Sequence, residues 1–140
     1  MSLPSSKDWD AHQEDPMKDK PISLVMQRVI KTVSLDATVH DVEAFLAGER
    51  LSWAPVLGDR GEVIGVISGA DLVRFHAQQG DPAMPAWREC TYRPISVTAS
   101  TPVGDVARLM VERRIHHVIV TEADAIVGIV SSLDLIENLV

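Results

Sequence analysis

The sequence predicts an α/β protein of the α+β kind, built from two copies of a β-α-β-β-α unit. One observation is an apolar run that ends in a Ser-x-x-Asp turn at residues 63–71 and recurs at residues 126–134. Another is constant spacing: the Gly, Ser and Asp of the two runs lie 63 residues apart, and upstream positions such as Val39 and Val103 lie 64 apart. A repeat of this length indicates a copied supersecondary unit. Because neither copy alone can cover both faces of its sheet, the two are expected to share a core.

The first copy is expected to begin at Pro21, after a flexible tail of residues 1–20 that has no hydrophobic period. The pattern predicts a helical turn at 24–27, strands at 29–33, 53–57 and 63–67, and helices at 39–46 and from 68 to about 76. Asp36 or Thr38 is placed to cap the first helix. Ser68 and Asp71 have the spacing of a capping box at the start of the second.

The second copy follows a linker at residues 79–88 that is marked by Gly and Pro. We expect strands at 95–97, 117–120 and 126–130 and helices at 103–110 and 131–139. Thr101 is placed to cap the helix that starts at Pro102. The expected organisation is a tail at 1–20, a first repeat at 21–78, the linker at 79–88 and a second repeat at 89–140.

Charge and composition argue against several classes of function. The 140 residues carry a formal net charge of −7, which opposes binding to a nucleic-acid backbone. No apolar run approaches the roughly 20 residues that span a bilayer, and the polar N-terminal segment does not have the pattern of a signal peptide. No nucleic acid or membrane is therefore expected as a partner. The single cysteine, Cys90, allows no internal disulfide and fits a reducing, cytoplasmic location.

The residue pattern is not that of an enzyme. It has no Ser-His-Asp arrangement, no P-loop and no paired-carboxylate motif, and Cys90 has no evident activating partner. A metal site is not expected, because adjacent histidines such as His116 and His117 point to opposite faces of a strand. We therefore expect a binding module without catalytic residues and without a required cofactor.

The doubled motifs make the chain resemble a tandem pair of cystathionine-β-synthase (CBS) domains, also called a Bateman module. The resemblance covers residues 21 to 140 and rests on Gly65-Val66-Ile67-Ser68-x-x-Asp71 and Gly128-Ile129-Val130-Ser131-x-x-Asp134. It rests also on Val25-Met26, Ala54-Pro55-Val56 and the run from Ile115 to Val120. It implies two lobes packed sheet to sheet about a pseudo-two-fold axis, with two clefts between them. Many members bind AMP, ADP, ATP or S-adenosyl compounds in these clefts and regulate an enzyme or channel.

The resemblance implies that Asp71 and Asp134 hold the ribose of such a ligand, since a carboxylate in the first turn of a helix can accept both protons of a diol. The alternative is a plain capping carboxylate, and the two roles can coexist. Ser68 and Ser131 are expected near the phosphate, because a hydroxyl beside free N–H groups at a helix start suits an anion. For these serines the alternative is an N-cap alone.

A basic cluster, Arg113-Arg114-Ile115-His116-His117, is the local exception in an acidic chain. The family often places His or Arg at the positions of His116 and His117, which implies that both reach the phosphate. The first copy has Ser52 and Trp53 at these positions, so two unequal clefts are expected. The alternative is a solvated helix end whose cations interact with the helix dipole.

Other residues are expected to line the same clefts or the core. Lys31, before the first strand, is a second candidate cation for the phosphate. The implied adenine wall consists of Ala54 and Pro55 in the first copy and of Val118 and Ile119 in the second. The second copy lacks the proline of this motif. We expect this difference to affect the selectivity for the ligand and not the fold. Met26 and Cys90, at matching positions before each first strand, are expected to pack in the core.

The expected function is a regulatory module that senses an adenine nucleotide (AMP, ADP or ATP) or an S-adenosyl compound. The alternative is a structural or protein-interaction module with empty clefts. A regulated enzyme or transporter is expected in trans, because no partner domain accompanies the pair. A homodimer is also expected, because the last helix and the apolar residues Leu72, Val73 and Phe75 exceed what one pair can cover.

Overall fold

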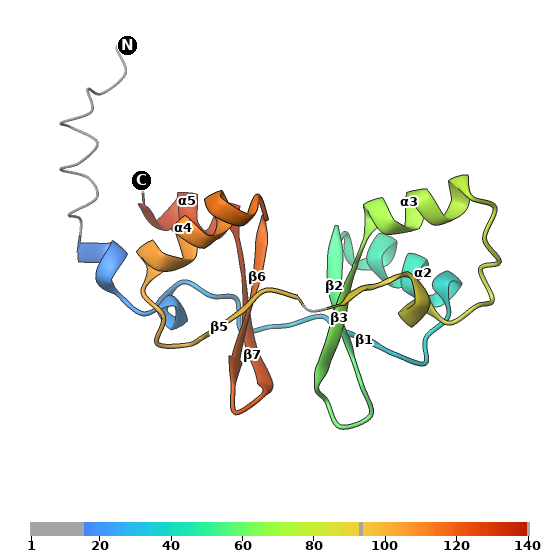
Figure 1. Cartoon of the computed structure of the whole chain (residues 1–140), viewed down its shortest axis with the longest axis horizontal. Coiled ribbons are helices and arrows are strands. Elements are labelled where there is room, and N and C mark those ends of the chain that lie inside the picture. The colour runs from blue at the N-terminus through green and yellow to red at the C-terminus, as the bar shows by residue number, and fades with distance from the viewer. Residues whose placement is uncertain (1–15, 93, 140) are drawn as a thin grey trace, which may run out of the picture. The chain divides into compact units, whose positions relative to one another are not determined.

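The computed structural model describes residues 16–92 and 94–139 of the chain (Figure 1). These residues form two compact units, and each is described by itself. Unit 1 contains residues 16–29, 96–122 and 127–139. Unit 2 contains residues 30–92, 94–95 and 123–126. The two-copy α/β architecture expected from the sequence is confirmed, since each unit pairs a small sheet with two α-helices.

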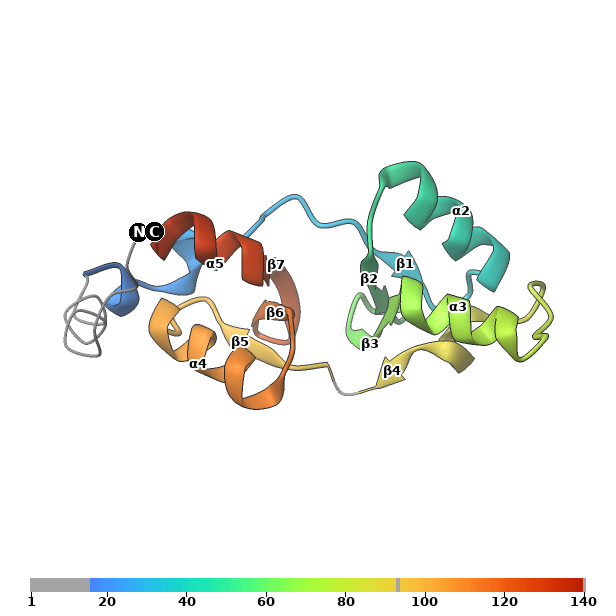
Figure 2. The same cartoon turned by 90° about the horizontal axis from the view of Figure 1, so that it is seen from above.

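Unit 2 has a four-stranded sheet in the order β1-β2-β3-β4. The strands are β1 (Val33–Ser34), β2 (Trp53–Leu57), β3 (Val63–Ser68) and β4 (Thr91–Tyr92). β1 runs parallel to β2, whereas β2, β3 and β4 are successively antiparallel. The helices α2 (Val39–Glu49) and α3 (Gly69–Ala77) lie on the same face of this sheet (Figure 2), and a 3-10 helix, Ala86–Glu89, precedes β4.

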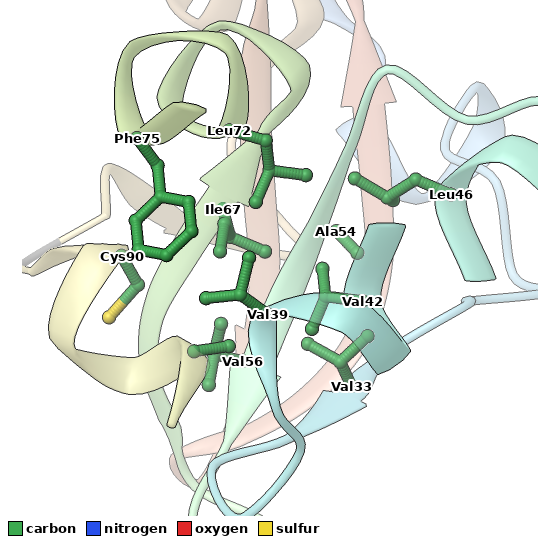
Figure 3. Packing of buried hydrophobic residues seen from close by; sticks show 11 residues of the cluster. Val33, Val39, Val42, Leu46, Ala54, Val56, Ile67, Leu72, Phe75 and Cys90 are labelled. Atoms are coloured by element: carbon green, nitrogen blue, oxygen red, sulfur yellow. The ribbon is translucent and has the colours of Figure 1, made fainter. Parts of the chain in front are cut away.

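The core of unit 2 lies between this sheet and its helices. Side chains from β1, β2, β3, α2 and α3 converge there (Figure 3): Val33, Ala54, Val56, Ile67, Val39, Val42, Leu46, Leu72 and Phe75, together with Cys90. α3 shows why the local sequence suits the fold. Its buried residues Leu72 and Phe75 face the core, and Ser68 and Asp71 form a reciprocal capping box at its start. Thr38 and Asp41 form the same box at the start of α2.

Unit 1 has a three-stranded sheet in the order β5-β6-β7, with β5 parallel to β6. The strands are β5 (Ser96–Thr98), β6 (His117–Glu122) and β7 (Ala125–Ser131), of which the part from Val127 belongs to this unit. The helices α4 (Val103–Arg113) and α5 (Ser132–Leu139) contact each other, and 3-10 helices span Pro16–Asp19 and Ile22–Leu24. Its fully buried side chains include Ile22, Val103, Val106, Val118, Ile119, Val120 and Val130.

Each unit is completed by a segment that precedes the first strand of the other repeat. In unit 1, the N–H of Gln27 donates to the carbonyl of Ile129 in β7 at 2.8 Å, and the N–H of Ile129 returns the bond at 3.0 Å. In unit 2, Thr91 in β4 pairs with Val66 in β3. Residues 16–29 therefore pack on the strands of the second repeat, and residues 86–92 pack on the strands of the first.

A glycine allows each of these close approaches. A Cβ on Gly65 would lie 2.6 Å from the carbonyl oxygen of Thr91 and 2.9 Å from Cys90 Sγ. A Cβ on Gly128 would overlap the thioether of Met26 and lie 3.2 Å from the carbonyl oxygen of Gln27. The glycine of each repeated motif therefore makes room for the segment that crosses β3 or β7.

Three expectations about local structure were wrong. Thr101 does not cap α4: Pro102 is the N-cap without a side-chain bond, and the first helical N–H, that of Val103, donates to the carbonyl of Lys20 at 2.8 Å. The strand expected at 29–33 is reduced to Val33–Ser34, because Val29 is exposed where the chain leaves unit 1. Leu72 and Phe75 are not surplus apolar surface, because both are buried in the core of unit 2.

Candidate functional site

The best-defined polar site of unit 1 is the carboxylate of Asp134 in the first turn of α5. Its Oδ2 accepts the N–H of Ser131 at 2.8 Å, and its own N–H donates to Ser131 Oγ at 3.1 Å. The side chain is nevertheless almost withdrawn from water, with Asp134 only 7% exposed. A buried carboxylate needs several hydrogen-bond donors to be stable. The capping box supplies one of these donors to Oδ2.

The other oxygen of Asp134 is bonded to a residue far away in the sequence. Gln27 Nε2 donates to Asp134 Oδ1 at 2.9 Å, across 107 positions of the chain. Gln27 belongs to the segment that pairs with Ile129 of β7, so its backbone is held beside the start of α5. Gln27 is not among the site residues expected from the sequence. The sequence contains only a weak indication of its role. Gln27 follows Met26 directly and lies 64 positions before Thr91, but nothing in that spacing identifies Asp134 as its hydrogen-bond partner.

His116 and His117 adjoin the same helix start. The N–H of Ser132 donates to the carbonyl of His116 at 2.9 Å, which ties the entrance of β6 to the first residue of α5. His116 is exposed and His117 is half-buried. Burial lowers the pKa of His117 from its ordinary value of 6.5, and the neighbouring charge of His116 lowers it further, while the Asp134 carboxylate acts in the opposite direction. Two imidazoles and a buried carboxylate therefore lie in one part of unit 1.

Unit 2 contains the equivalent site with different partners. Asp71 Oδ2 accepts from the N–H of Ser68 at 2.8 Å and from Ser68 Oγ at 2.9 Å, and the N–H of Asp71 returns to Ser68 Oγ at 3.2 Å. Its Oδ1 accepts from Arg74 Nη1 at 3.3 Å, one turn along the same helix. The N–H of Gly69 donates to the carbonyl of Ser52 at 2.9 Å, as that of Ser132 does to His116 in unit 1. The starts of α3 and α5 thus share the same backbone hydrogen bond. They differ in charge, because Asp71 is bonded to a cationic arginine, whereas Asp134 is bonded to a neutral glutamine.

The remaining candidate cations are exposed. Lys31 Nζ lies 3.4 Å from Glu49 Oε2 in unit 2, in a pair whose two side chains are both solvated. Arg113 ends α4, and Arg114 is its C-cap in the left-handed conformation with φ 54°. Cations at the C-terminal end of a helix are favoured by its dipole. The position of the two arginines thus agrees with the helix-end alternative, whereas the two histidines lie at the start of the next strand.

The residues expected to form the adenine wall are all buried: Ala54 and Pro55 in β2, and Val118 and Ile119 in β6. Met26 and Cys90 are also buried, as expected from their matching positions before each first strand. Cys90 Sγ donates to the carbonyl of Trp87 at 3.1 Å.

Within residues 16–92 and 94–139, no group of three or more His, Cys, Asp and Glu side chains is placed to hold a metal ion. In the same part of the chain, each helix is too short or too polar to cross a bilayer.

Comparison with known proteins identifies one sequence family. The profile of the CBS domain matches residues 20–77 and again residues 87–140. The uncharacterized protein MJ1225 of Methanocaldococcus jannaschii is 26% identical over 122 residues, which make up 86% of this chain and 43% of that protein. The chain thus spans less than half the length of this curated relative.

Solved structures with the same fold include two archaeal proteins. An uncharacterized conserved protein from Pyrococcus horikoshii has a TM-score of 0.78 and 28% identity, over 86% of this chain and 92% of that one. The CBS domain protein PAE2072 from Pyrobaculum aerophilum, solved in complex with AMP, has a TM-score of 0.75 and 26% identity, over 85% of this chain and 97% of that one.

Proposed function

The chain belongs to the CBS domain family, and we propose that it is a regulatory module that senses an adenine nucleotide or a related adenosyl compound. The observation that carries the proposal is the Asp134 carboxylate, buried at the start of α5 and bonded at each oxygen. An ionised carboxylate accepts about four hydrogen bonds, so one acceptor position on each oxygen is left for the two hydroxyls of a ribose. Asp71 places a carboxylate at the same position of unit 2, but its Oδ2 already accepts both the N–H and the hydroxyl of Ser68, so a free acceptor position is left on Oδ1 alone.

The anionic part of the ligand is proposed to lie near Ser131, His116 and His117 in unit 1. An acidic chain with net charge −7 needs a local concentration of donors to hold a phosphate. A helix start with a capping hydroxyl and two adjacent imidazoles supplies it. In unit 2 the corresponding donors are Ser68 and, from the strand side, Lys31. In each unit, the buried strand residues are proposed to contact the adenine of a ligand bound in that unit: the backbone of Val118 and Ile119 in unit 1, and that of Ala54 and Pro55 in unit 2.

The AMP complex of the Pyrobaculum aerophilum protein supports this class of ligand, because that protein shares 26% of its residues with this chain over most of both lengths. The ligand would regulate by binding one conformation of the module better than another, since equal affinity for two states shifts neither. We propose that the ligand is not chemically altered and that a regulated enzyme or transporter reads the change in trans.

The module is proposed to act as a homodimer through α5. Leu133 and Ile136 of that helix are 60% and 56% exposed, although Leu135 between them is buried. Apolar side chains that share one face of a surface helix are typical of a contact with another protein.

Isothermal calorimetry with AMP, ADP, ATP, S-adenosylmethionine and adenosine tests the proposed function. At least one adenosyl compound should bind, and Asp134→Ala should weaken it by roughly 1.5–3 kcal/mol, the value of hydrogen bonds to a charged group. Glu137→Ala is the matched control, because it removes an exposed acid from the same helix. A folded protein that binds no member of the panel would favour the alternative, a structural or protein-interaction module.

A further inference from the structure

We propose that Gln27 is a positioning residue that makes the site of unit 1 select ribose over deoxyribose. This inference rests on the proposed function, because it concerns how the same site selects its ligand. Gln27 Nε2 donates to Asp134 Oδ1 at 2.9 Å and is the partner of the carboxylate oxygen that the capping box does not use. The residue would therefore decide the direction in which the free acceptor positions of Asp134 point.

The backbone of Gln27 is held firmly enough for this role. It exchanges two hydrogen bonds with Ile129, at 2.8 and 3.0 Å, inside a segment that is otherwise without regular strand pairing to β7. The preceding residue, Met26, is buried against Gly128, where any larger residue would meet its side chain. The carboxamide therefore starts from a fixed point, and its reach to Asp134 does not depend on a mobile loop.

The number of acceptor positions on the Asp134 carboxylate indicates that Gln27 positions this group and does not compete with the ribose for it. Ser131 N–H occupies one position on Oδ2, and Gln27 occupies one on Oδ1. One position then remains on each oxygen, which matches a diol that donates one proton from each hydroxyl. Without Gln27, a carboxylate that is only 7% exposed would lose the donor on Oδ1 and would turn toward other donors.

Unit 2 has no equivalent arrangement. Thr91 occupies the position that corresponds to Gln27, with a hydroxyl on Cβ in place of a longer carboxamide. Asp71 Oδ1 is instead bonded to Arg74, a side chain that is 64% exposed and belongs to the same helix. Gln27 and Arg74 are both exposed, but Arg74 donates over 3.3 Å against 2.9 Å for Gln27, and an exposed ion pair restrains a carboxylate weakly. The ribose preference set by Gln27 should therefore belong to unit 1 alone.

The experiment compares AMP with 2′-deoxy-AMP by calorimetry in the Asp71→Ala background, so that binding in unit 2 is weakened. With Gln27 present, AMP should bind about tenfold or more tightly than 2′-deoxy-AMP, as expected for a hydrogen bond to a charged group. This ratio should fall at least about threefold in Gln27→Ala and in Gln27→Glu, which keeps the length but replaces the donor by a repelling charge. Gln27→Asn, whose side chain is one methylene shorter, should lower the ratio of affinities as Gln27→Ala does. It replaces either of the other two variants if that variant does not fold. Val29→Ala, an exposed change in the same segment, should keep the ratio.

Because both ligands carry the same phosphate and base, a merely structural role of Gln27 would weaken both and leave their ratio unchanged. An unchanged ratio in a folded variant overturns the inference and leaves the proposed function standing. If the protein with Gln27 intact binds neither nucleotide, the same comparison is made with the member of the calorimetric panel that does bind and its 2′-deoxy analogue. Binding of no member of the panel overturns the proposed function, and the inference fails with it.

Discussion

Asp71 and Asp134 close the same capping box in the two units, but their Oδ1 atoms have different partners. Asp134 Oδ1 accepts from Gln27, 107 positions away, whereas Asp71 Oδ1 accepts from Arg74, three positions along its own helix. The local part of the repeated motif is thus preserved in both copies, while the long-range part differs. Variants of the capping box should therefore change the stability of the protein equally in the two units. Variants that affect ligand affinity should act differently in the two units.

Ser68→Ala and Ser131→Ala should each lower the free energy of unfolding by about 1 kcal/mol, the usual cost of removing an N-cap side chain. Both hydroxyls accept the N–H of the aspartate three residues later, at 3.2 and 3.1 Å. Urea unfolding followed by circular dichroism measures the change. Ser132→Ala is the matched control, because its N–H donates to the His116 carbonyl from the backbone, which alanine retains. An equal loss in the control would contradict the assignment.

Gly65→Ala should destabilise the protein by about 1–3 kcal/mol, the range for overpacking a tight site. The added Cβ would meet the carbonyl oxygen of Thr91 at 2.6 Å, and a backbone atom within a sheet cannot easily move. Gly128→Ala should cost less, because the atom that it meets first is the thioether of Met26, part of a flexible side chain. Thermal and urea unfolding of both variants give the order.

The control for the glycine pair is Gly48→Ala in α2, where a new Cβ would have no neighbour within 4 Å. That change should stabilise the protein by roughly 0.5–1 kcal/mol, because alanine is the better helix former. Combining Gly128→Ala with Met26→Ala should remove part of the cost of the glycine change. If Gly65→Ala did not lower the stability relative to Gly48→Ala, the close packing of Thr91 against Gly65 would be contradicted.

The strands and capping boxes could be predicted because their signals are local. Ser68 and Asp71, for example, lie three residues apart, and the box that they form is complete within that distance. The contact of Gln27 with Asp134 could not be predicted, because no spacing rule connects residues 107 positions apart. The sequence showed that Leu72 and Phe75 are apolar residues of one short helix, but not that their own unit covers both side chains. Thr101 failed as a cap because a carbonyl from another segment, that of Lys20, had already paired with the first N–H of α4.

His117 should make the stability of the protein depend on pH. Burial lowers its pKa in the folded state below the value of 6.5, so the unfolded chain binds a proton more readily than the folded one. Its contribution to stability is therefore full above pH 6.5 and is lost as the pH falls through that value toward the folded pKa. His117→Gln should lose less stability than the native sequence between pH 7.5 and pH 5.5. Urea midpoints at both values give the difference, and His40→Gln, an exposed histidine on α2, should behave like the native sequence.

Leu133→Glu and Ile136→Glu should convert a homodimer to a monomer. Both side chains are more than half exposed on α5, and a buried, unpaired carboxylate in the proposed interface would cost several kcal/mol. Light scattering at tens of micromolar gives the mass. Val73→Glu, at an exposed position on α3 in unit 2, distinguishes a general effect of charge from an effect of this helix face. A native protein that is monomeric at this concentration would rule out the dimer.

His116→Ala should reduce the affinity for AMP relative to adenosine, and it should do so more strongly than His117→Ala. Both residues lie beside the start of α5, but His116 is exposed, whereas His117 is half-buried with a pKa lowered by that burial. Burial thus makes His117 less able to carry a positive charge toward a phosphate. An imidazolium attracts the phosphate dianion, so AMP affinity should rise as the pH falls from 8 to 6. Part of the rise is offset because a phosphate monoester itself gains a proton near pH 6.

Adenosine is the control ligand, because it lacks the phosphate and should bind with little dependence on pH. Calorimetry at pH 8, 7 and 6 with both ligands gives the difference for the native protein and for each variant. His116→Ala should lower the affinity for AMP, and the adenosine affinity should stay within about twofold of the native value. If neither histidine variant loses AMP affinity relative to adenosine, the phosphate does not lie at this end of β6. The basic residues from Arg113 to His117 would then be only the solvated end of α4.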